Sequence, residues 1–99
     1  MISIKNSKKF VVFTNAFTPN QDGFNDFFRP KTSNISQFHM SIYNQWGQFL
    51  FETNNLETGW NGFMNGVKCP SGLYVYLVSY IFQDAAETKT KRGSFTLIE

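Results

Sequence analysis

Residues 18–26, with the sequence TPNQDGFND, carry oxygen-bearing side chains at a spacing that suits a bound cation. They follow the apolar run 10–17 but cannot extend it as a strand, because Pro19 lacks a backbone N–H and Gly23 readily takes a positive φ. Asn and Asp side chains also bond to their own backbone in Asx turns. The sequence therefore predicts a built loop here, and calcium is the cation that oxygen ligands of this kind would hold.

The spacing matches part of a twelve-position calcium-binding loop, which takes oxygen ligands at positions 1, 3, 5, 7, 9 and 12 and Gly at position 6. With Asn20 at position 3, Asp22 falls at position 5, Gly23 at 6 and Asp26 at 9. Position 12 is Arg29, which is not a cation ligand, so we expect calcium affinity to be weak. The alternative is a loop held by its own Asx turns, in which the two carboxylates accept backbone N–H groups.

The length and composition indicate one small domain. A domain of 99 residues buries only roughly 60–65% of the surface that its unfolded chain exposes. Aromatic residues make up 18% of the chain and include twelve Phe, which supply bulky core side chains. We expect residues 10–99 to form the domain and residues 1–9 to be a flexible segment or a linker remnant. Residues 1–9 lack the apolar part of a signal peptide. A secreted protein must carry such a peptide somewhere, so for a secreted protein we expect this chain to be a fragment from the end of a longer one.

Several classes of function are disfavoured by the sequence. A net charge of +2 does not provide the strongly basic face typical of nucleic-acid binding. No apolar run approaches the ~20 residues of a membrane helix, so we expect no membrane-spanning segment. His39 is the one histidine and lies within a predicted strand, and neither a Gly-rich phosphate loop nor a nucleophile elbow is present. We therefore expect the protein not to be an enzyme.

The single cysteine, Cys69, cannot form an internal disulfide. One Cys and one His are also too few ligands for a zinc site. We interpret Cys69, which precedes Pro70, as a small half-buried apolar residue rather than a reactive thiol.

The elements predicted from periodicity are almost all strands. Alternation of apolar and polar residues, or short runs of aromatic and β-branched residues, predicts strands at 10–17, 38–43, 49–51, 63–64, 67–68, 73–82 and 94–97. Asn65-Gly66 lies between two of them and is typical of a type I′ hairpin turn. The strand at 73–82 is apolar on both sides, so we expect it to be covered on both faces or to lie at an interface. Short strands separated by turns predict an antiparallel β-sandwich.

Two further groups of residues have both a structural and a functional interpretation. Trp46 and Trp60 each lie beside a Gly at a strand end, where they would cap the core or, alternatively, stack against a sugar. The basic residues Lys89, Lys91 and Arg92 approach the last strand. They would form a solvated edge that blocks aggregation or, alternatively, a docking strip for a partner protein.

The chain resembles a known family, the type B C-terminal sorting domain of the type IX secretion system, also called the gliding motility-associated C-terminal domain of Bacteroidetes. The resemblance rests on the order and spacing of short motifs over about 80 residues. They are FTPN at 17–20, DGFND at 22–26, IYNQWG at 42–47, WNG at 60–62, NG at 65–66, PSGLYVY at 70–76 and RGSFTLI at 92–98.

The resemblance implies an immunoglobulin-like sandwich of about seven strands and a non-catalytic role as a secretion signal. It implies recognition in the periplasm by the type IX translocon, export of an upstream cargo domain to the cell surface or medium, and pairing with an outer-membrane protein of the PorP/SprF kind. Two alternatives remain at this point. One is a calcium-dependent adhesin or carbohydrate-binding module, with Asn20, Asp22 and Asp26 as ligands and Trp46 or Trp60 for stacking. The other is a spacer between domains.

Overall fold

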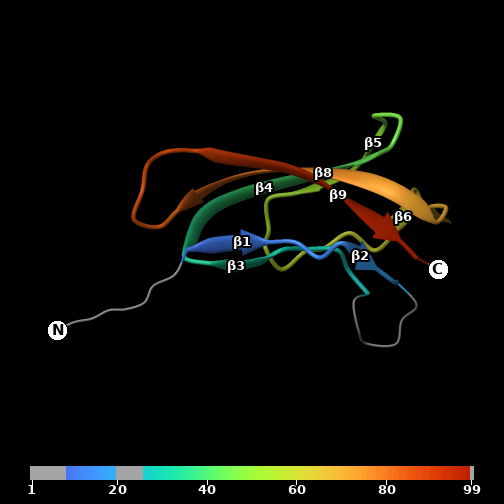
Figure 1. The fold of residues 1–99 in the computed structure, drawn as a ribbon, viewed down its shortest axis with the longest axis horizontal. Helices are drawn as coiled ribbons and strands as arrows, with labels where there is room; N and C mark the ends of the chain where they lie inside the picture. Colours follow the sequence, from blue (N-terminus) through green and yellow to red (C-terminus); the bar gives the residue numbers. More distant parts are fainter. Residues whose placement is uncertain (1–8, 20–25, 99) are drawn as a thin grey trace.

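The computed structural model describes residues 9–19 and 26–98, which form strands joined by turns (Figure 1). The strands are β1 (Phe10–Val12), β2 (Ala16–Phe17), β3 (Lys31–Ser33), β4 (Ile35–Asn44), β5 (Phe49–Thr53), β6 (Phe63–Met64), β7 (Val67–Lys68), β8 (Gly72–Phe82) and β9 (Lys89–Leu97). Helices are absent from this part of the chain. The all-β prediction is therefore confirmed.

One five-stranded sheet dominates the structure, with strand order β2-β9-β8-β4-β5. The long strands β4, β8 and β9 pair antiparallel with one another, and β4 continues into β5 through a hairpin. The short strand β2 pairs with β9 in parallel, through Ala16 with Thr96 and Phe17 with Leu97. This pair departs from the purely antiparallel sheet that the sequence predicts. The chain reaches β2 from the second layer and there runs in the same direction as the end of β9, so the two strands pair in parallel.

The second layer covers one face of this sheet and completes the sandwich. It contains the antiparallel pairs β1-β3 and β6-β7, together with an isolated bridge between Phe28 and Trp60. Figure 1 shows β1 and β3 running alongside each other against β8 and β9. The other face of the five-stranded sheet has exposed apolar side chains, among them Leu73 and Leu77.

The core lies between the two layers and is largely aromatic. Strand alternation turns one set of side chains from β4, β8 and β9 inward, where they meet aromatic rings of the second layer. Two pairs are closely stacked: Phe28 on Phe95 with ring centroids 3.7 Å apart, and Phe13 on Tyr76 at 3.9 Å. The buried cluster comprises Phe17, Phe28, Phe38, Met40, Ile42, Trp60, Cys69, Tyr74, Tyr76, Val78, Phe95 and Leu97.

The apolar run 10–17 does not form the single strand that its sequence predicts. Its first part, β1, pairs with β3 in the second layer, whereas its last part, β2, pairs with β9 in the main sheet. The backbone passes from one layer to the other at residues 13–15, and the carbonyl of Asn15 accepts the N–H of Thr96 at 2.8 Å. The described residues therefore contain nine strands instead of about seven. Four of the nine, β1, β3, β6 and β7, belong to the second layer and are only two or three residues long.

The β6–β7 hairpin confirms the turn predicted from Asn65-Gly66. Phe63 pairs with Lys68 and Met64 with Val67, so two residues form the loop. Both of them have positive φ, 52° at Asn65 and 79° at Gly66, as a type I′ turn requires.

Replacement of Gly66 by Ala is expected to destabilise the domain by about 1 kcal/mol, because a Cβ is strained at positive φ. No atom lies within 4 Å of the added Cβ, so the loss would reflect backbone strain alone. Thermal unfolding should show a midpoint lower by about 4–8 °C. Asn65→Gly is the control and should retain the wild-type midpoint, because Gly adopts this φ freely. Equal midpoints for Gly66→Ala and wild type would contradict the turn assignment.

Candidate recognition surface

The loop that matches part of a calcium site lies mostly outside the described residues. Asn20 and Asp22 belong to residues 20–25, whereas Asp26 is described and half-buried. Within 9–19 and 26–98, no group of three His, Cys, Asp or Glu side chains is placed to hold a metal ion. Calcium binding by Asn20, Asp22 and Asp26 therefore stays a prediction.

Trp46 lies at the tip of the β4–β5 hairpin and is 84% exposed. Asn44 builds this tip, because its Oδ1 accepts the backbone N–H groups of Trp46 and Gln48, each at 2.9 Å. Its Nδ2 also donates to Oε1 of Gln48 at 2.9 Å, and Gly47 supplies a positive φ of 86°. The interpretation of Trp46 as a cap on the core is therefore wrong: the hairpin carries the ring beyond the end of the sandwich.

Trp60 also lies beside a glycine but is fully buried. Its backbone exchanges two hydrogen bonds with Phe28, at 2.8 and 3.0 Å. Its indole Nε1–H donates to the carbonyl of Phe63 at 3.0 Å, so the polar atom of the ring is satisfied inside the core. The core interpretation holds for Trp60, and the alternative of sugar stacking is wrong because no face of this ring reaches solvent.

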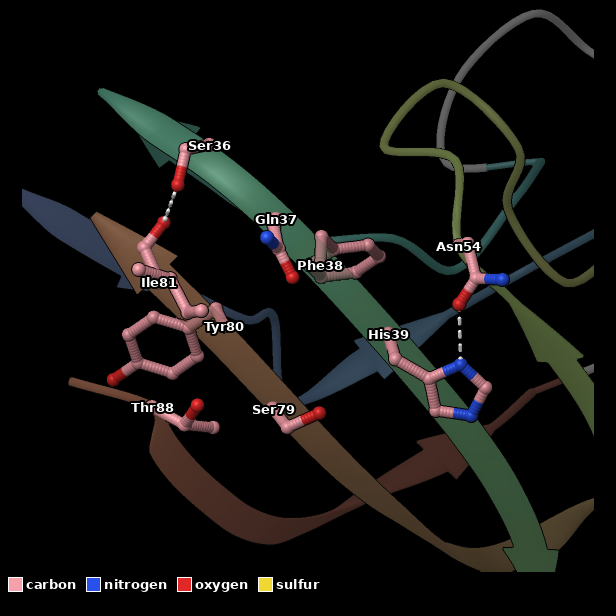
Figure 2. Close-up of a pocket in the computed structure, with 9 residues that line it drawn as sticks. All are labelled: Ser36, Gln37, Phe38, His39, Asn54, Ser79, Tyr80, Ile81 and Thr88. Carbon is pink, nitrogen blue, oxygen red and sulfur yellow. Dashed lines mark hydrogen bonds between the residues drawn. The ribbon is translucent and has the colours of Figure 1, made fainter. Parts of the chain in front are cut away.

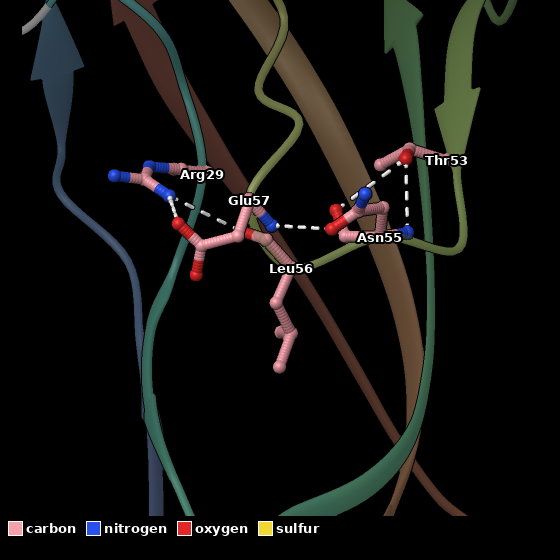
Figure 3. A network of polar contacts seen from close by, with 5 residues as sticks. All are labelled: Arg29, Thr53, Asn55, Leu56 and Glu57. Atoms are coloured by element: carbon pink, nitrogen blue, oxygen red, sulfur yellow. Dashed lines mark hydrogen bonds and ion pairs between the residues drawn. The ribbon is translucent and has the colours of Figure 1, made fainter.

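The loop before Trp60 is held by polar contacts that Figure 3 shows. Thr53 Oγ1 accepts the N–H of Asn55 at 3.0 Å, and Asn55 Oδ1 accepts the N–H of Glu57 at 2.8 Å. Arg29 forms an ion pair with Glu57 at 3.0 Å. These contacts join the chain that leaves β5 to the segment of Phe28, next to the backbone bridge between Phe28 and Trp60.

The three basic residues of β9 do not share one surface. Lys91 points toward the second layer, where its Nζ donates to the carbonyl of Val11 at 3.0 Å and lies 6.0 Å from the ring centroid of Phe13. Lys89 lies on the same face and approaches Glu87 at 3.9 Å. Arg92 lies on the opposite, exposed face of the sheet. The three side chains therefore do not form one continuous strip on a single face, and a docking role for them stays a prediction.

The division of these residues follows from strand alternation and was readable from the sequence. Residues two apart share a face, so Lys89 and Lys91 must lie on the face of Phe95 and Leu97 whereas Arg92 must lie on the other. Lys91 thus ties β9 to β1, and Arg92 is left as the basic residue of the open face.

A polar hollow of about 560 Å³ lies over the paired strands β4 and β8, next to the irregularity in their register between Ile35 and Gln37 (Figure 2). His39 Nδ1 lies 2.6 Å from Asn54 Oδ1, and its Nε2 lies 3.2 Å from Glu52 Oε1 and 3.3 Å from Ser41 Oγ. Both ring nitrogens are thus engaged with neighbouring oxygens, which fixes the ring against the sheet. The side chain is partly exposed, as expected for a strand histidine on the solvent face.

Cys69 is buried, and burial raises the pKa of its thiol above the ordinary value while a hydrogen bond with Tyr74 acts in the opposite direction. A raised pKa leaves little thiolate at neutral pH. Cys69 therefore behaves as the apolar residue that its sequence position predicts, although it is more fully buried than expected.

Comparison with known families decides what kind of domain this is. The sequence profile of the CHU_C type IX secretion signal domain matches residues 11–97, which run from β1 to the end of β9. The chain belongs to this family. No curated protein compared with this chain matches it.

Membership fixes the role of this secretion signal domain. It directs the cargo joined to it across the outer membrane through the type IX secretion system, to the cell surface or the medium. Domains of this family act as signals rather than catalysts. The described part of the chain contains no helix long and apolar enough to cross a membrane.

Proposed function

We propose that this secretion signal domain is non-catalytic and is read as a folded surface rather than as a linear tail. The observation that carries the proposal is that the family match begins at Val11 and ends at Leu97, and so covers the folded sandwich from β1 to β9. In β9, Phe95 and Leu97 are each 1% exposed within the core. A receptor that bound this strand as an extended peptide would have to unfold the domain first.

The proposal extends to the route and the partners, which the resemblance to this family suggests. The cargo, with this domain attached, crosses the inner membrane and folds in the periplasm, where the type IX translocon recognises the signal. An outer-membrane protein of the PorP/SprF kind pairs with the complex. The two layers packed around an aromatic core support passage of the domain in its folded state, because a compact fold presents the same surface throughout.

The proposal predicts export that depends on both the domain and the apparatus. The 99-residue chain is fused behind a fluorescent reporter that carries a signal peptide for the inner membrane, and the fusion is produced in a bacterium with a type IX system. We expect the reporter at the cell surface or in the medium of this strain. A matched reporter without the domain should stay in the periplasm, as should the complete fusion in a strain that lacks the translocon. Export of the fusion without the translocon would refute the proposal.

A further inference from the structure

The open face of the five-stranded sheet carries an apolar patch, which we call the outer patch. Pairing across the sheet places Tyr43 beside Phe49 and Val75, and Leu77 beside Arg92, on this face. Leu77 is 43% and Phe49 45% exposed. The outer patch comprises Tyr43, Phe49, Leu73, Val75, Leu77 and Arg92.

A shallow hollow of about 300 Å³ lies within this face, beside the hairpin tip that carries Trp46. Tyr43, Val75 and Leu77 line it together with Arg92. The strand β8 therefore presents apolar side chains on both of its faces. One face lies in the core, and the other is exposed in the outer patch. The sequence predicts that such a strand is either covered on both faces within the domain or lies at an interface. Because one face of β8 is exposed, the interface is the explanation that remains.

Arg92 defines the charge that an occupant must bring. It lies directly opposite Leu77, and its guanidinium makes no hydrogen bond or ion pair with another described residue. Glu52, in the same row of the sheet, is separated from it by β4 and β8 and is engaged with His39. A partner with a carboxylate beside an apolar side chain would fill the hollow and neutralise the guanidinium. An Arg guanidinium binds a carboxylate through two parallel N–H···O hydrogen bonds.

The composition of the outer patch favours a protein over a sugar as this occupant. Tyr, Phe, Trp and Arg are enriched at protein interfaces and supply most of their strongest contacts. A second copy that paired through the same patch is a poorer match, because the outer patch contains no carboxylate to set against Arg92.

We propose that the outer patch is the surface by which the type IX apparatus holds this domain, and that its occupant is a protein surface with a carboxylate beside an apolar side chain. This proposal rests on the proposed function. Leu77 contacts the apolar side chain of the occupant, and Arg92 forms the ion pair.

The test uses the reporter fusion with Leu77→Ser and Arg92→Glu. Val67→Ser and Lys68→Glu are matched controls, because these residues are exposed on the β6–β7 hairpin of the other layer. We expect each outer-patch variant to reduce export by about tenfold or more, as loss of an interface anchor does, and the controls to export like wild type. Purified variants should keep the wild-type unfolding midpoint, which separates recognition from folding.

A second measurement does not depend on the variants folding equally well. A photo-crosslinking amino acid at position 77 should join the domain to an outer-membrane component of the type IX apparatus, and the same group at position 67 should not. Normal export of Leu77→Ser and Arg92→Glu, or equal cross-linking from both positions, would overturn the outer patch while leaving the proposed function intact. A wild-type dimer in sedimentation that Leu77→Ser abolishes would make a second copy the occupant and would also overturn it. Export that needs no translocon would instead remove the proposed function.

Discussion

Replacement of Trp60 by Ala is expected to destabilise the domain by about 3–5 kcal/mol, the largest loss that we expect from a single substitution here. Trp60 is fully buried, and its ring centroid lies 5.3 Å from that of Tyr74 and 5.8 Å from that of Phe17. Truncation would leave a large cavity and would also orphan the carbonyl of Phe63, which accepts the indole N–H. Small domains are stable by only about 5–15 kcal/mol, so the variant would be close to unfolding.

Chemical denaturation followed by far-ultraviolet circular dichroism measures this effect independently of tryptophan fluorescence. Trp46→Ala is a well-matched control, since it removes the same side chain from a position that is 84% exposed. We expect this control to change the free energy of unfolding by no more than about 0.5 kcal/mol. Similar losses from the two substitutions would contradict the assignment of Trp60 to the core and Trp46 to the surface.

The second large effect is expected from Gly93→Ala, which should destabilise the domain by about 1–3 kcal/mol through overpacking. Gly93 lies opposite Tyr76 in the β8–β9 register, and the phenol ring of Tyr76 lies over it. A Cβ at position 93 would come within 2.6 Å of Tyr76 Cζ and 2.8 Å of Cε2, closer than real contacts allow. The ring would have to leave the position in which it stacks on Phe13, with ring centroids 3.9 Å apart.

A double-mutant cycle identifies the cause of this loss. In a Tyr76→Leu background the added methyl group meets no ring, so Gly93→Ala should cost much less there than in the wild-type domain. Ser94→Ala, at the exposed neighbouring position, controls for a general effect of alanine in β9 and should stay within about 0.5 kcal/mol of wild type. The same cost in both backgrounds would show that contact with Tyr76 is not the reason.

Local patterns in the sequence determined much of this fold. Alternation placed Phe95 and Leu97 inside, the hairpin around Trp46-Gly47 joined β4 to β5, and Asn65-Gly66 formed its turn. These features depend on residues near one another in the chain, where strand period and turn conformation decide the outcome. The family motifs extend over the same region, and the secretion role follows from them without the tertiary structure.

Tertiary structure alone decided the features that depend on distant partners. Trp46 and Trp60 each lie beside a glycine in the sequence. Trp46 lies exposed at a hairpin tip, whereas Trp60 is held in the core by its backbone bridge to Phe28. The run 10–17 divided between two layers because β3 and β9 offered pairing partners on different sides of the core. The exposure of Leu77 beside Arg92 likewise depends on the second layer covering only one face of the sheet. Local sequence does not encode which face is covered, because that is set by where segments far apart in the chain meet.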